Sequence, residues 1–308
     1  MNILAIGGSG FIGHHLIKAL REAGHDVAVL GRSKEPARGL PDGVRYLCGS
    51  TLDRSYLAEN LCGFDTVAHL ATTTVPSTGD RDPCADVSQN LVGTINLLDA
   101  MVEKGIERIL FLSSGGTVYG PPRDIPVKET HRLSPTCSYG IVKSAIEMYL
   151  ELYARNSGLR YVSIRASNAY GPLQGNLGVQ GIIGTLLGRI LEGKPLEIWG
   201  DGSVVRDYIF ISDLIQLCVR ALESSKVGAY NGGSGIGTSV QDIANLVQYT
   251  TGNDAEVIYH PSRGCDVPVC VLDVSRAQAD FNWKAEVDLH EGVKRTWRSI
   301  KYEGKPSS

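Results

Sequence analysis

The sequence lacks an excess of charge of either sign, and it lacks any long uninterrupted run of apolar residues. Its 308 residues carry 30 Lys and Arg against 33 Asp and Glu, a net charge of −3. Nucleic acids and anionic membranes call for a basic surface, so this balance argues against both as partners. No apolar run approaches the roughly 20 residues of a membrane span. No charged leader precedes the first strand pattern, Asn2–Ile6, so we also expect no secretory signal.

Cysteines are few, and none of them form a CxxC pair. The seven are Cys48, Cys62, Cys84, Cys137, Cys218, Cys265 and Cys270. Their number is odd, and their spacing fits neither a disulfide framework nor a zinc site. We therefore expect reduced thiols, no bound metal and a cytoplasmic location.

The first half of the chain alternates short apolar runs with longer helical stretches. The expected strands are Asn2–Ile6, Val27–Leu30, Val44–Cys48, Thr66–Leu70, Arg108–Ser113 and Tyr161–Arg165. The expected helices between them are Phe11–Ala23, Ser55–Leu61, Pro83–Glu103 and Ser138–Asn156. Such alternation predicts an α/β fold, in which a doubly wound parallel sheet is covered by helices on both faces.

A glycine-rich segment, GGSGFIG at residues 7–13, joins the first strand to the first helix. Gly7 permits a tight turn, Gly10 lets the backbone approach a pyrophosphate, and Gly13 allows close contact between helix and strand. The free N–H groups at the start of the helix then attract the phosphates. The segment predicts a Rossmann-type dinucleotide site that includes Phe11 and Ile12.

Beyond about residue 168, glycine and proline become denser and the alternation loosens. The expected elements here are helices at Val179–Glu192, Ser212–Glu223 and Val240–Thr251 and strands at Leu196–Trp199 and Asp207–Ile211. We expect residues 1–168 to form the dinucleotide-binding domain and residues 169–308 a smaller C-terminal α/β substrate-binding domain. The second would pack over the carboxyl edge of the sheet, where open α/β folds bind ligands.

The end of the second strand has no acidic residue. NAD enzymes usually place a carboxylate there to bind the adenosine ribose, whereas this chain has Gly31-Arg32-Ser33. Arg32 could pair with the 2′-phosphate of NADP, stack on adenine or stay in solvent. This position therefore leaves both NAD and NADP open.

Tyr139 and Lys143 form a YxxxK pattern. Residues four apart on a helix share one face, so the phenol and the ammonium can point into the same site. A nearby cation favours the phenolate and lowers the pKa of the tyrosine, which makes Tyr139 a candidate acid and base. A pair on the surface of a helix is the alternative interpretation of the spacing alone.

About 25 residues upstream of Tyr139, an apolar strand ends in a loop rich in hydroxyls and glycine, Ser113–Gly120. Together with the glycine segment and YxxxK, this loop resembles the extended short-chain dehydrogenase/reductase family of epimerases and dehydratases, over residues 1 to about 298. The resemblance implies that Lys143 also binds the nicotinamide ribose of NAD. It further implies that Leu70 and Ala71 line the cofactor site and that Asn90 supports it.

One position departs from the family pattern. UDP-galactose 4-epimerases usually carry their catalytic serine where this chain has Gly115. Ser114 and Thr117 flank the gap, and Thr117 matches a residue that contacts substrate in the family. We expect Thr117, or Ser114 after a small loop shift, to supply the hydroxyl, and the substitution Thr117→Val to be the more damaging of the two.

Segments of the second half resemble the sugar-nucleotide site of the family. They imply the substrate-binding residues Asn168, Val179, Trp199, Arg206, Arg263 and Asp266. The guanidinium groups suit phosphate, and the resemblance gives Asn168 to the pyrophosphate, Asp266 to the ribose and Trp199 to the base pocket. Surface salt bridges for the arginines, a turn position for Asn168 and a core position for Trp199 are the alternatives.

The absence of carboxylates after the expected catalytic hydroxyl argues against a dehydratase reaction. Dehydratases of the family carry an Asp-Glu pair directly after the catalytic hydroxyl, where this chain has Gly116 and Thr117. An epimerase needs no further acid: Tyr139 takes the proton of the 4-hydroxyl, hydride passes from C4 to bound nicotinamide, and the 4-keto sugar receives it back on the other face. We therefore predict a nucleotide-sugar 4-epimerase acting on a UDP-hexose with NAD.

Two other functions stay open from the sequence. Gly31 and Arg32 favour an NADPH-dependent 4-keto reductase on the same class of substrate. A dinucleotide-sensing regulatory protein is a non-enzymatic alternative, which the intact Tyr139 and Lys143 oppose. The resemblance also implies a homodimer that forms through the helices expected at Pro83–Glu103 and Ser138–Asn156.

Overall fold

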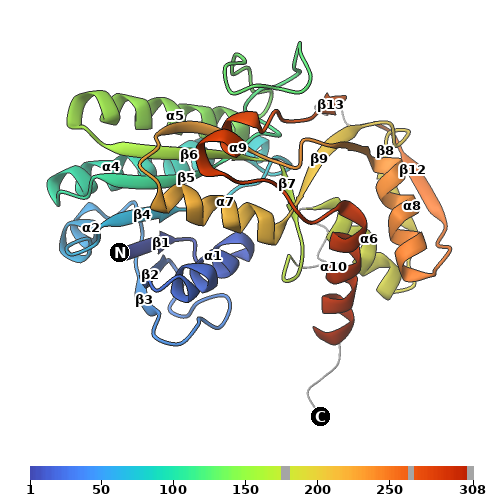
Figure 1. Cartoon of the computed structure of the whole chain (residues 1–308), viewed down its shortest axis with the longest axis horizontal. Helices are drawn as coiled ribbons and strands as arrows, with labels where there is room; N and C mark the ends of the chain where they lie inside the picture. Colours follow the sequence, from blue (N-terminus) through green and yellow to red (C-terminus); the bar gives the residue numbers. More distant parts are fainter. Residues whose placement is uncertain (175–180, 263–266, 304–308) are drawn as a thin grey trace.

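A seven-stranded sheet forms the centre of the protein, whose computed structural model describes residues 1–174, 181–262 and 267–303 (Figure 1). Its strands run in the order β10-β6-β5-β4-β1-β2-β3, and every neighbouring pair is parallel. They are β1 (Asn2–Ile6), β2 (Asp26–Gly31), β3 (Arg45–Cys48), β4 (Thr66–His69), β5 (Arg108–Ser114), β6 (Arg160–Ala166) and β10 (Gly228–Gly232). The predicted Rossmann-type parallel sheet is confirmed.

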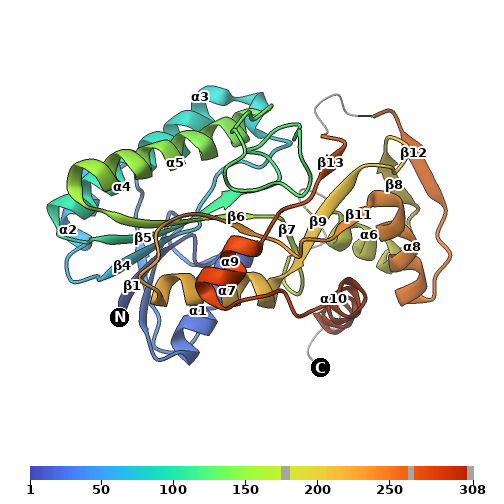
Figure 2. The ribbon, with the colours of Figure 1, turned by 45° about the horizontal axis from the view of Figure 1, so that its top comes forward.

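Helices cover both faces of this sheet, with α4 and α5 on one side and α1 and α7 on the other (Figure 2). Their bounds, with α2 beside α4, are α1 (Phe11–Glu22), α2 (Arg54–Asn60), α4 (Gly93–Glu103), α5 (Ser138–Ser157) and α7 (Ile211–Glu223). Because successive side chains of a strand point to opposite faces, Ile3 and Ala5 of β1 join one buried cluster. Leu4 and Ile6 join the other. Burial on both faces explains the continuous apolar runs of the sequence.

The second half of the chain builds a smaller layer at the carboxyl edge of the sheet. One group of strands is β7 (Asn168–Tyr170), β9 (Val205–Phe210), β11 (Gly237–Ser239) and β13 (Val269–Cys270). A separate pair is β8 (Leu196–Trp199) with β12 (Val257–His260). The accompanying helices are α6 (Ile182–Leu191), α8 (Val240–Thr251), α9 (Ser275–Phe281) and α10 (Leu289–Glu303).

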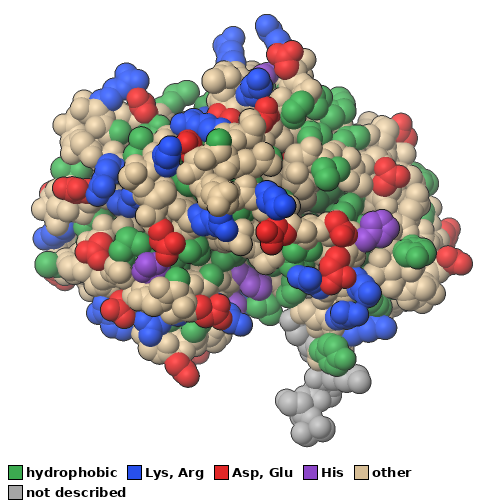
Figure 3. All heavy atoms as spheres, in the orientation of Figure 1, with side chains coloured by type: hydrophobic (Ala, Val, Ile, Leu, Met, Phe, Trp, Pro, Cys, Tyr) green, Lys and Arg blue, Asp and Glu red, His purple; other side chains and the backbone are tan. Residues whose placement is uncertain are grey.

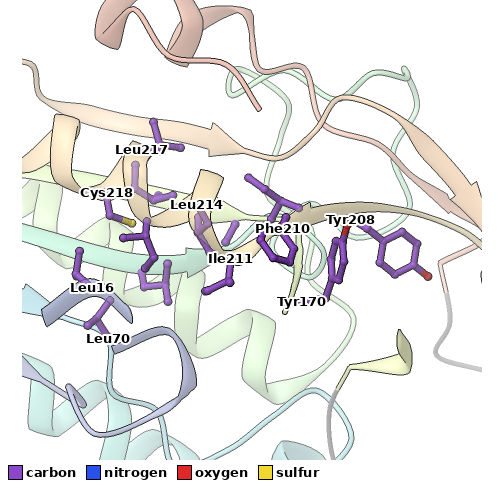
Figure 4. Close-up of a cluster of buried hydrophobic side chains, with 14 of the residues drawn as sticks. Leu16, Leu70, Tyr170, Tyr208, Phe210, Ile211, Leu214, Leu217 and Cys218 are labelled. Atoms are coloured by element: carbon purple, nitrogen blue, oxygen red, sulfur yellow. The ribbon is translucent and has the colours of Figure 1, made fainter. Parts of the chain in front are cut away.

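One buried cluster runs without a break from the central sheet into this layer (Figure 4). It includes Leu16 of α1 and Leu70, passes along Leu214 of α7, and continues through Phe210 and Tyr170 into the second layer. Both α7 and β10 come from the second half of the chain but cover or extend the central sheet. The chain thus returns to the central sheet after residue 169. The expected boundary between two domains after residue 168 stays a prediction.

The helix expected at Pro83–Glu103 is interrupted. It consists of α3 (Pro83–Asp86), a π-helical turn η2 (Val87–Val92) and α4. The wider turn contains Asn90, whose amide contacts the loop after β4, and such turns occur often at functional sites. The expected helix Val179–Glu192 is described from Ile182 onward, and Val179 lies outside the described residues.

Acidic and basic side chains are interspersed over the face shown in Figure 3. This mixture agrees with the small net charge of −3. Within the described ranges, no helix is long and apolar enough to cross a membrane.

Candidate active site

The glycine-rich segment forms the expected turn between β1 and α1. Gly7 has φ +85°, and a β-carbon there would lie 2.8 Å from the backbone of Ala71, at the end of the neighbouring strand β4. A β-carbon on Gly13 would collide with the carbonyl oxygen of Gly7. Both glycines are therefore required by close backbone approach. The turn brings together the predicted cofactor residues Gly7, Gly10, Phe11, Ile12, Gly13, Leu70 and Ala71.

Gly10 faces open space rather than protein. A β-carbon there would meet only the Gly7 carbonyl oxygen, at 3.3 Å. Gly10 is also the N-cap of α1 and offers no side chain to its first turn. Helix N–H groups that lack a capping side chain, next to a surface without side chains, suit a phosphate. The cradle therefore fits the pyrophosphate of a nicotinamide dinucleotide.

Arg32 directly follows the last residue of β2. Its side chain is exposed and donates a hydrogen bond to Gln89, at 3.1 Å, from the end of β2. At the preceding position, a side chain on Gly31 would collide with the hydroxyl of Tyr46. The packing explains the glycine, whereas the choice between phosphate pairing and adenine stacking by Arg32 stays open.

Tyr139 and Lys143 lie on the buried face of α5, with only 9% and 4% of their surface exposed. Lys143 donates a hydrogen bond to the carbonyl oxygen of Leu112, at 2.7 Å. Its ammonium lies 4.5 Å from the ring centre of Phe111 and 5.7 Å from that of Tyr139. The carboxyl end of β5 therefore holds the ammonium beside the phenol, and the alternative of a surface pair is wrong.

Burial controls the protonation of both groups. It raises the pKa of Tyr139 well above its usual range, and a hydrogen bond with the Ser114 side chain partly opposes this rise. Burial lowers the pKa of Lys143 to about 8, while the charges of Glu147 and Asp86 raise it. The phenol of the protein alone is thus protonated at neutral pH, and the expectation that the nearby cation lowers its pKa is wrong for this state, because burial dominates.

Ser114, the last residue of β5, is the hydroxyl that contacts Tyr139. The Thr117 hydroxyl lies 3.5 Å from the carbonyl oxygen of Ser114, in the turn that follows. A β-carbon at Gly115 would lie 2.6 Å from the Leu272 side chain and 2.9 Å from the carbonyl oxygen of Arg165. Packing therefore excludes a catalytic serine at 115, and the contact with Tyr139 comes from the residue before it.

Asn90 joins the π-helical turn to the loop after β4. Its amide oxygen accepts a hydrogen bond from the N–H of Thr73 at 2.9 Å, and its amide nitrogen donates to Asp86 at 2.8 Å. Asn90 thus links the π-helical turn to the loop after β4, and its supporting role in the cofactor site stays a prediction.

Two of the predicted substrate residues, Asn168 and Arg206, fall on neighbouring strands of the second layer. Asn168 of β7 pairs in register with Tyr208, two residues after Arg206 on β9. Asn168 donates a hydrogen bond to the Asp207 carbonyl oxygen at 3.0 Å, and Arg206 donates to the carbonyl oxygen of Val267. Of the remaining expected residues, Val179, Arg263 and Asp266 lie outside the described part of the chain.

The side chain of Trp199 is partly exposed and packs against another ring. Its ring stacks on His260, with centres 5.1 Å apart and planes at 27°, and 38% of its surface is exposed. The two residues are register partners on β8 and β12. A core position for Trp199 is therefore wrong, and a base pocket at this stacked pair stays a prediction.

Several residues near the site carry no signal in the sequence. Arg38 donates hydrogen bonds to the carbonyl oxygens of Ser9 in the glycine turn, at 3.2 Å, and of Leu173, at 2.7 Å. His15 of α1 lies 2.9 Å from the carbonyl oxygen of Pro172. These contacts tie the glycine turn to the start of the second layer. No spacing rule links positions so far apart in the chain.

Comparison with known proteins agrees with this geometry. A family model described as the NAD dependent epimerase/dehydratase family matches residues 3–233. The putative UDP-glucose 4-epimerase of Methanocaldococcus jannaschii is 34% identical over 295 residues, which cover 95% of this chain and 96% of that protein.

Solved structures are similar over the whole fold. UDP-glucose 4-epimerase from Thermotoga maritima with UDP-glucose has a TM-score of 0.95 at 34% identity, covering 99% of this chain and 100% of the other. The Thermus thermophilus UDP-glucose 4-epimerase in complex with NAD has a TM-score of 0.92 at 32% identity, with coverage of 98% and 99%. From its fold, its Tyr–Lys site and these matches, the chain belongs to the NAD-dependent epimerase/dehydratase family.

Proposed function

We propose that this protein is a UDP-hexose 4-epimerase that works with tightly bound NAD. The observation that carries the proposal is the Lys143 ammonium, held by the Leu112 carbonyl oxygen at 5.7 Å from the ring centre of Tyr139, with Ser114 at the end of the same strand. No carboxylate follows Ser114, because Gly115 and Gly116 occupy the next positions. Such a site can move one proton reversibly but has no added acid with which to expel water.

In the proposed reaction, the residues of the chain handle binding and the proton. The glycine turn would hold the pyrophosphate of the cofactor, and Lys143 its nicotinamide ribose. When bound, NAD supplies reversible hydride acceptance at C4 of the sugar. Once the phenol has lost its own proton, the Tyr139 phenolate would take the proton of the 4-hydroxyl and later return it to the 4-keto oxygen, and Ser114 would hydrogen-bond the same oxygen. Lys143 stabilises the phenolate while Tyr139 lacks its proton.

The substrate would lie between the two layers. Relatives named UDP-glucose 4-epimerase, one of them solved with UDP-glucose, support a UDP-hexose as substrate. Arg206 and Asn168, on adjacent strands, would bind its diphosphate, and the stacked ring of Trp199 would lie at the base. Residues Val179, Arg263 and Asp266 are proposed to complete this site.

Two measurements test this function. Mass spectrometry of the cofactor released on denaturing the purified protein is expected to find NAD. Incubation with a panel of UDP- and other nucleotide-hexoses, without added reductant, is expected to give the 4-epimers. NADP with conversion only of 4-keto sugars would favour the reductase. Bound dinucleotide with no conversion of any sugar, and no effect of Tyr139→Phe, would favour a sensor.

We further propose that the protein is a cytoplasmic homodimer. The outer face of α5 exposes Ile141, Met148 and Leu152, which are 54%, 63% and 46% exposed and lie on one side of the helix. Val92, the last residue before α4, is 41% exposed. An apolar stripe on two neighbouring helices suits a helix pair from a second copy. Free thiols at Cys48, Cys62, Cys84, Cys218 and Cys270 support a reducing compartment.

A further inference from the structure

A carboxylate that the proposed chemistry does not use lies buried beside Tyr139. Asp86, at the end of α3, has no exposed surface. Its oxygens accept hydrogen bonds from the Ser138 hydroxyl at 2.7 Å, the Asn90 amide at 2.8 Å and the Thr74 hydroxyl at 2.8 Å. Among the described residues, no cation pairs with it. Burying a carboxylate costs desolvation free energy, and here only neutral donors offset that cost. A role in solubility does not explain the carboxylate, because it does not reach the surface.

The partner of Asp86 begins the helix that carries Tyr139. The N-cap of α5, Cys137, makes no capping hydrogen bond with its side chain. The N–H of Ser138 donates instead to Asp80, at 2.7 Å, on the 3₁₀ turn η1 (Gly79–Arg81). The Ser138 hydroxyl donates to Asp86. Two carboxylates from a segment over 50 residues away thus hold the positive end of the α5 dipole.

The packing between this segment and α5 leaves no room for slippage. A β-carbon on Gly79 would lie 2.9 Å from Asp86 Oδ2 and 3.0 Å from the backbone nitrogen of Tyr139. Gly79 therefore packs tightly against both Asp86 and the first turn of α5, which Asp86 itself contacts at Ser138, one residue before the phenol. Through Asn90 and Thr74, the same carboxylate also contacts the loop after β4.

We infer that Asp86 and Ser138 are positioning residues for Tyr139, fixing the first turn of α5 against the loop after β4. This inference rests on the proposed function, in which Tyr139 must meet the sugar and the cofactor at once. A hydrogen bond to a charged group holds the turn more firmly than a neutral cap would. Small displacements of a catalytic group cost large factors in rate.

The charge of Asp86 also reaches the catalytic pair. Two groups on α5, Tyr139 and Lys143, feel the charge of Asp86. Asp80 of η1 binds the same residue as Asp86, Ser138, through its backbone N–H. The Cys137 thiol lies close enough to Tyr139 to affect its pKa. The negative charge raises the pKa of Tyr139 and of Lys143. Removal of the charge should lower both pKa values, whereas removal of the Ser138 hydroxyl leaves the charge in place.

The test compares Asp86→Asn and Ser138→Ala with Asp82→Asn in the full-length protein carrying its cofactor. Asp82 caps α3 from an exposed position, so its substitution removes the same charge nearby without touching α5. Both positioning variants should lower kcat about 10- to 100-fold with little change in KM, as for a lost charge-assisted hydrogen bond. The double variant should lose no more than the worse single one. Only Asp86→Asn should move the basic limb of the pH–rate profile, to lower pH, because the charge of Asp86 raises the pKa of Lys143.

A readout without activity separates this inference from the proposed function. Hydrogen exchange of the first-turn amides of α5 should speed up in Asp86→Asn and Ser138→Ala and stay unchanged in Asp82→Asn. Unchanged exchange in the two variants, or lowered melting temperature with native kcat, would overturn the positioning role. Native protein that converts no nucleotide-hexose would contradict the proposed function instead, and the exchange result would still decide about Asp86.

Discussion

The side chain of Leu272 occupies the space that a side chain at residue 115 would need. A β-carbon at Gly115 would approach it to 2.6 Å and the carbonyl oxygen of Arg165 to 2.9 Å. Leu272 is itself fully buried at the junction of the two layers. The contact explains why this position holds glycine rather than the serine expected from the family pattern.

We therefore expect Gly115→Ser to destabilise the fold. Overpacking against backbone should lower the free energy of unfolding by about 1–3 kcal/mol, measured by urea denaturation. Gly116→Ala is the matched control, because a β-carbon at Gly116 meets nothing within 4 Å. It should be neutral or slightly stabilising. Equal stability of the two variants would show that the pocket around 115 adapts freely.

Ser114→Ala should reduce kcat more than Thr117→Val does. Ser114 contacts the phenol of Tyr139, whereas the Thr117 hydroxyl lies 3.5 Å from a backbone carbonyl in the following turn. This geometry reverses the order expected from the family pattern alone. Steady-state kinetics on the best UDP-hexose measures it, and a larger loss in Thr117→Val would return the hydroxyl role to Thr117.

Tyr139→Phe should abolish epimerisation and keep the cofactor bound. The phenol is buried and carries the only proton exchange that the proposed reaction requires. The glycine turn that would hold the pyrophosphate is untouched by this change. Product analysis checks the loss of epimerisation, and cofactor content measured on the same preparation checks that the cofactor stays bound. Turnover within a few-fold of the native rate would contradict the assignment.

The basic limb of the kcat/KM profile should lie near the pKa of Lys143, about 8. As pH rises through this value the ammonium loses its proton, and the phenolate loses its electrostatic support. Glu147 raises this pKa, so Glu147→Gln should move the limb to lower pH. The substitution also leaves Arg165 buried without its partner, 2.6 Å away, at about 3–5 kcal/mol of stability.

These profiles are therefore best recorded well below the melting temperature of the variant. Glu151→Gln is the control on the same helix, because Glu151 is more exposed and pairs with Arg155. It should leave the basic limb in place. A limb that does not respond to Glu147→Gln would show that another group controls it.

Met148→Glu should give a monomer if the homodimer forms through α4 and α5. Met148 is the most exposed of the apolar residues on the outer face of α5. A charge at the centre of a helix–helix interface costs several kcal/mol in desolvation, about enough to dissociate a micromolar dimer. Analytical ultracentrifugation measures the result. Ile236→Glu, at a site 68% exposed elsewhere, should leave the native mass unchanged.

The sequence by itself determined the features that depend on neighbours within a few residues. The turn at Gly7 and Gly13, the buried parallel strands and the shared face of Tyr139 and Lys143 follow from backbone geometry and the periods of strand and helix. Each of these was read from a single continuous segment. Short strands such as β10, bounded by Gly228 and Gly232, gave too few residues for a period to show.

Only the tertiary structure decided which groups meet across the chain. The glycine at residue 115 is fixed by Leu272, more than 150 residues away, which fills the space that a side chain there would need. The position of Asp86 against the first turn of α5 depends in the same way on packing between distant segments. Such contacts are fixed by excluded volume and hydrogen bonding in three dimensions, and the spacing of residues along the chain carries no record of them.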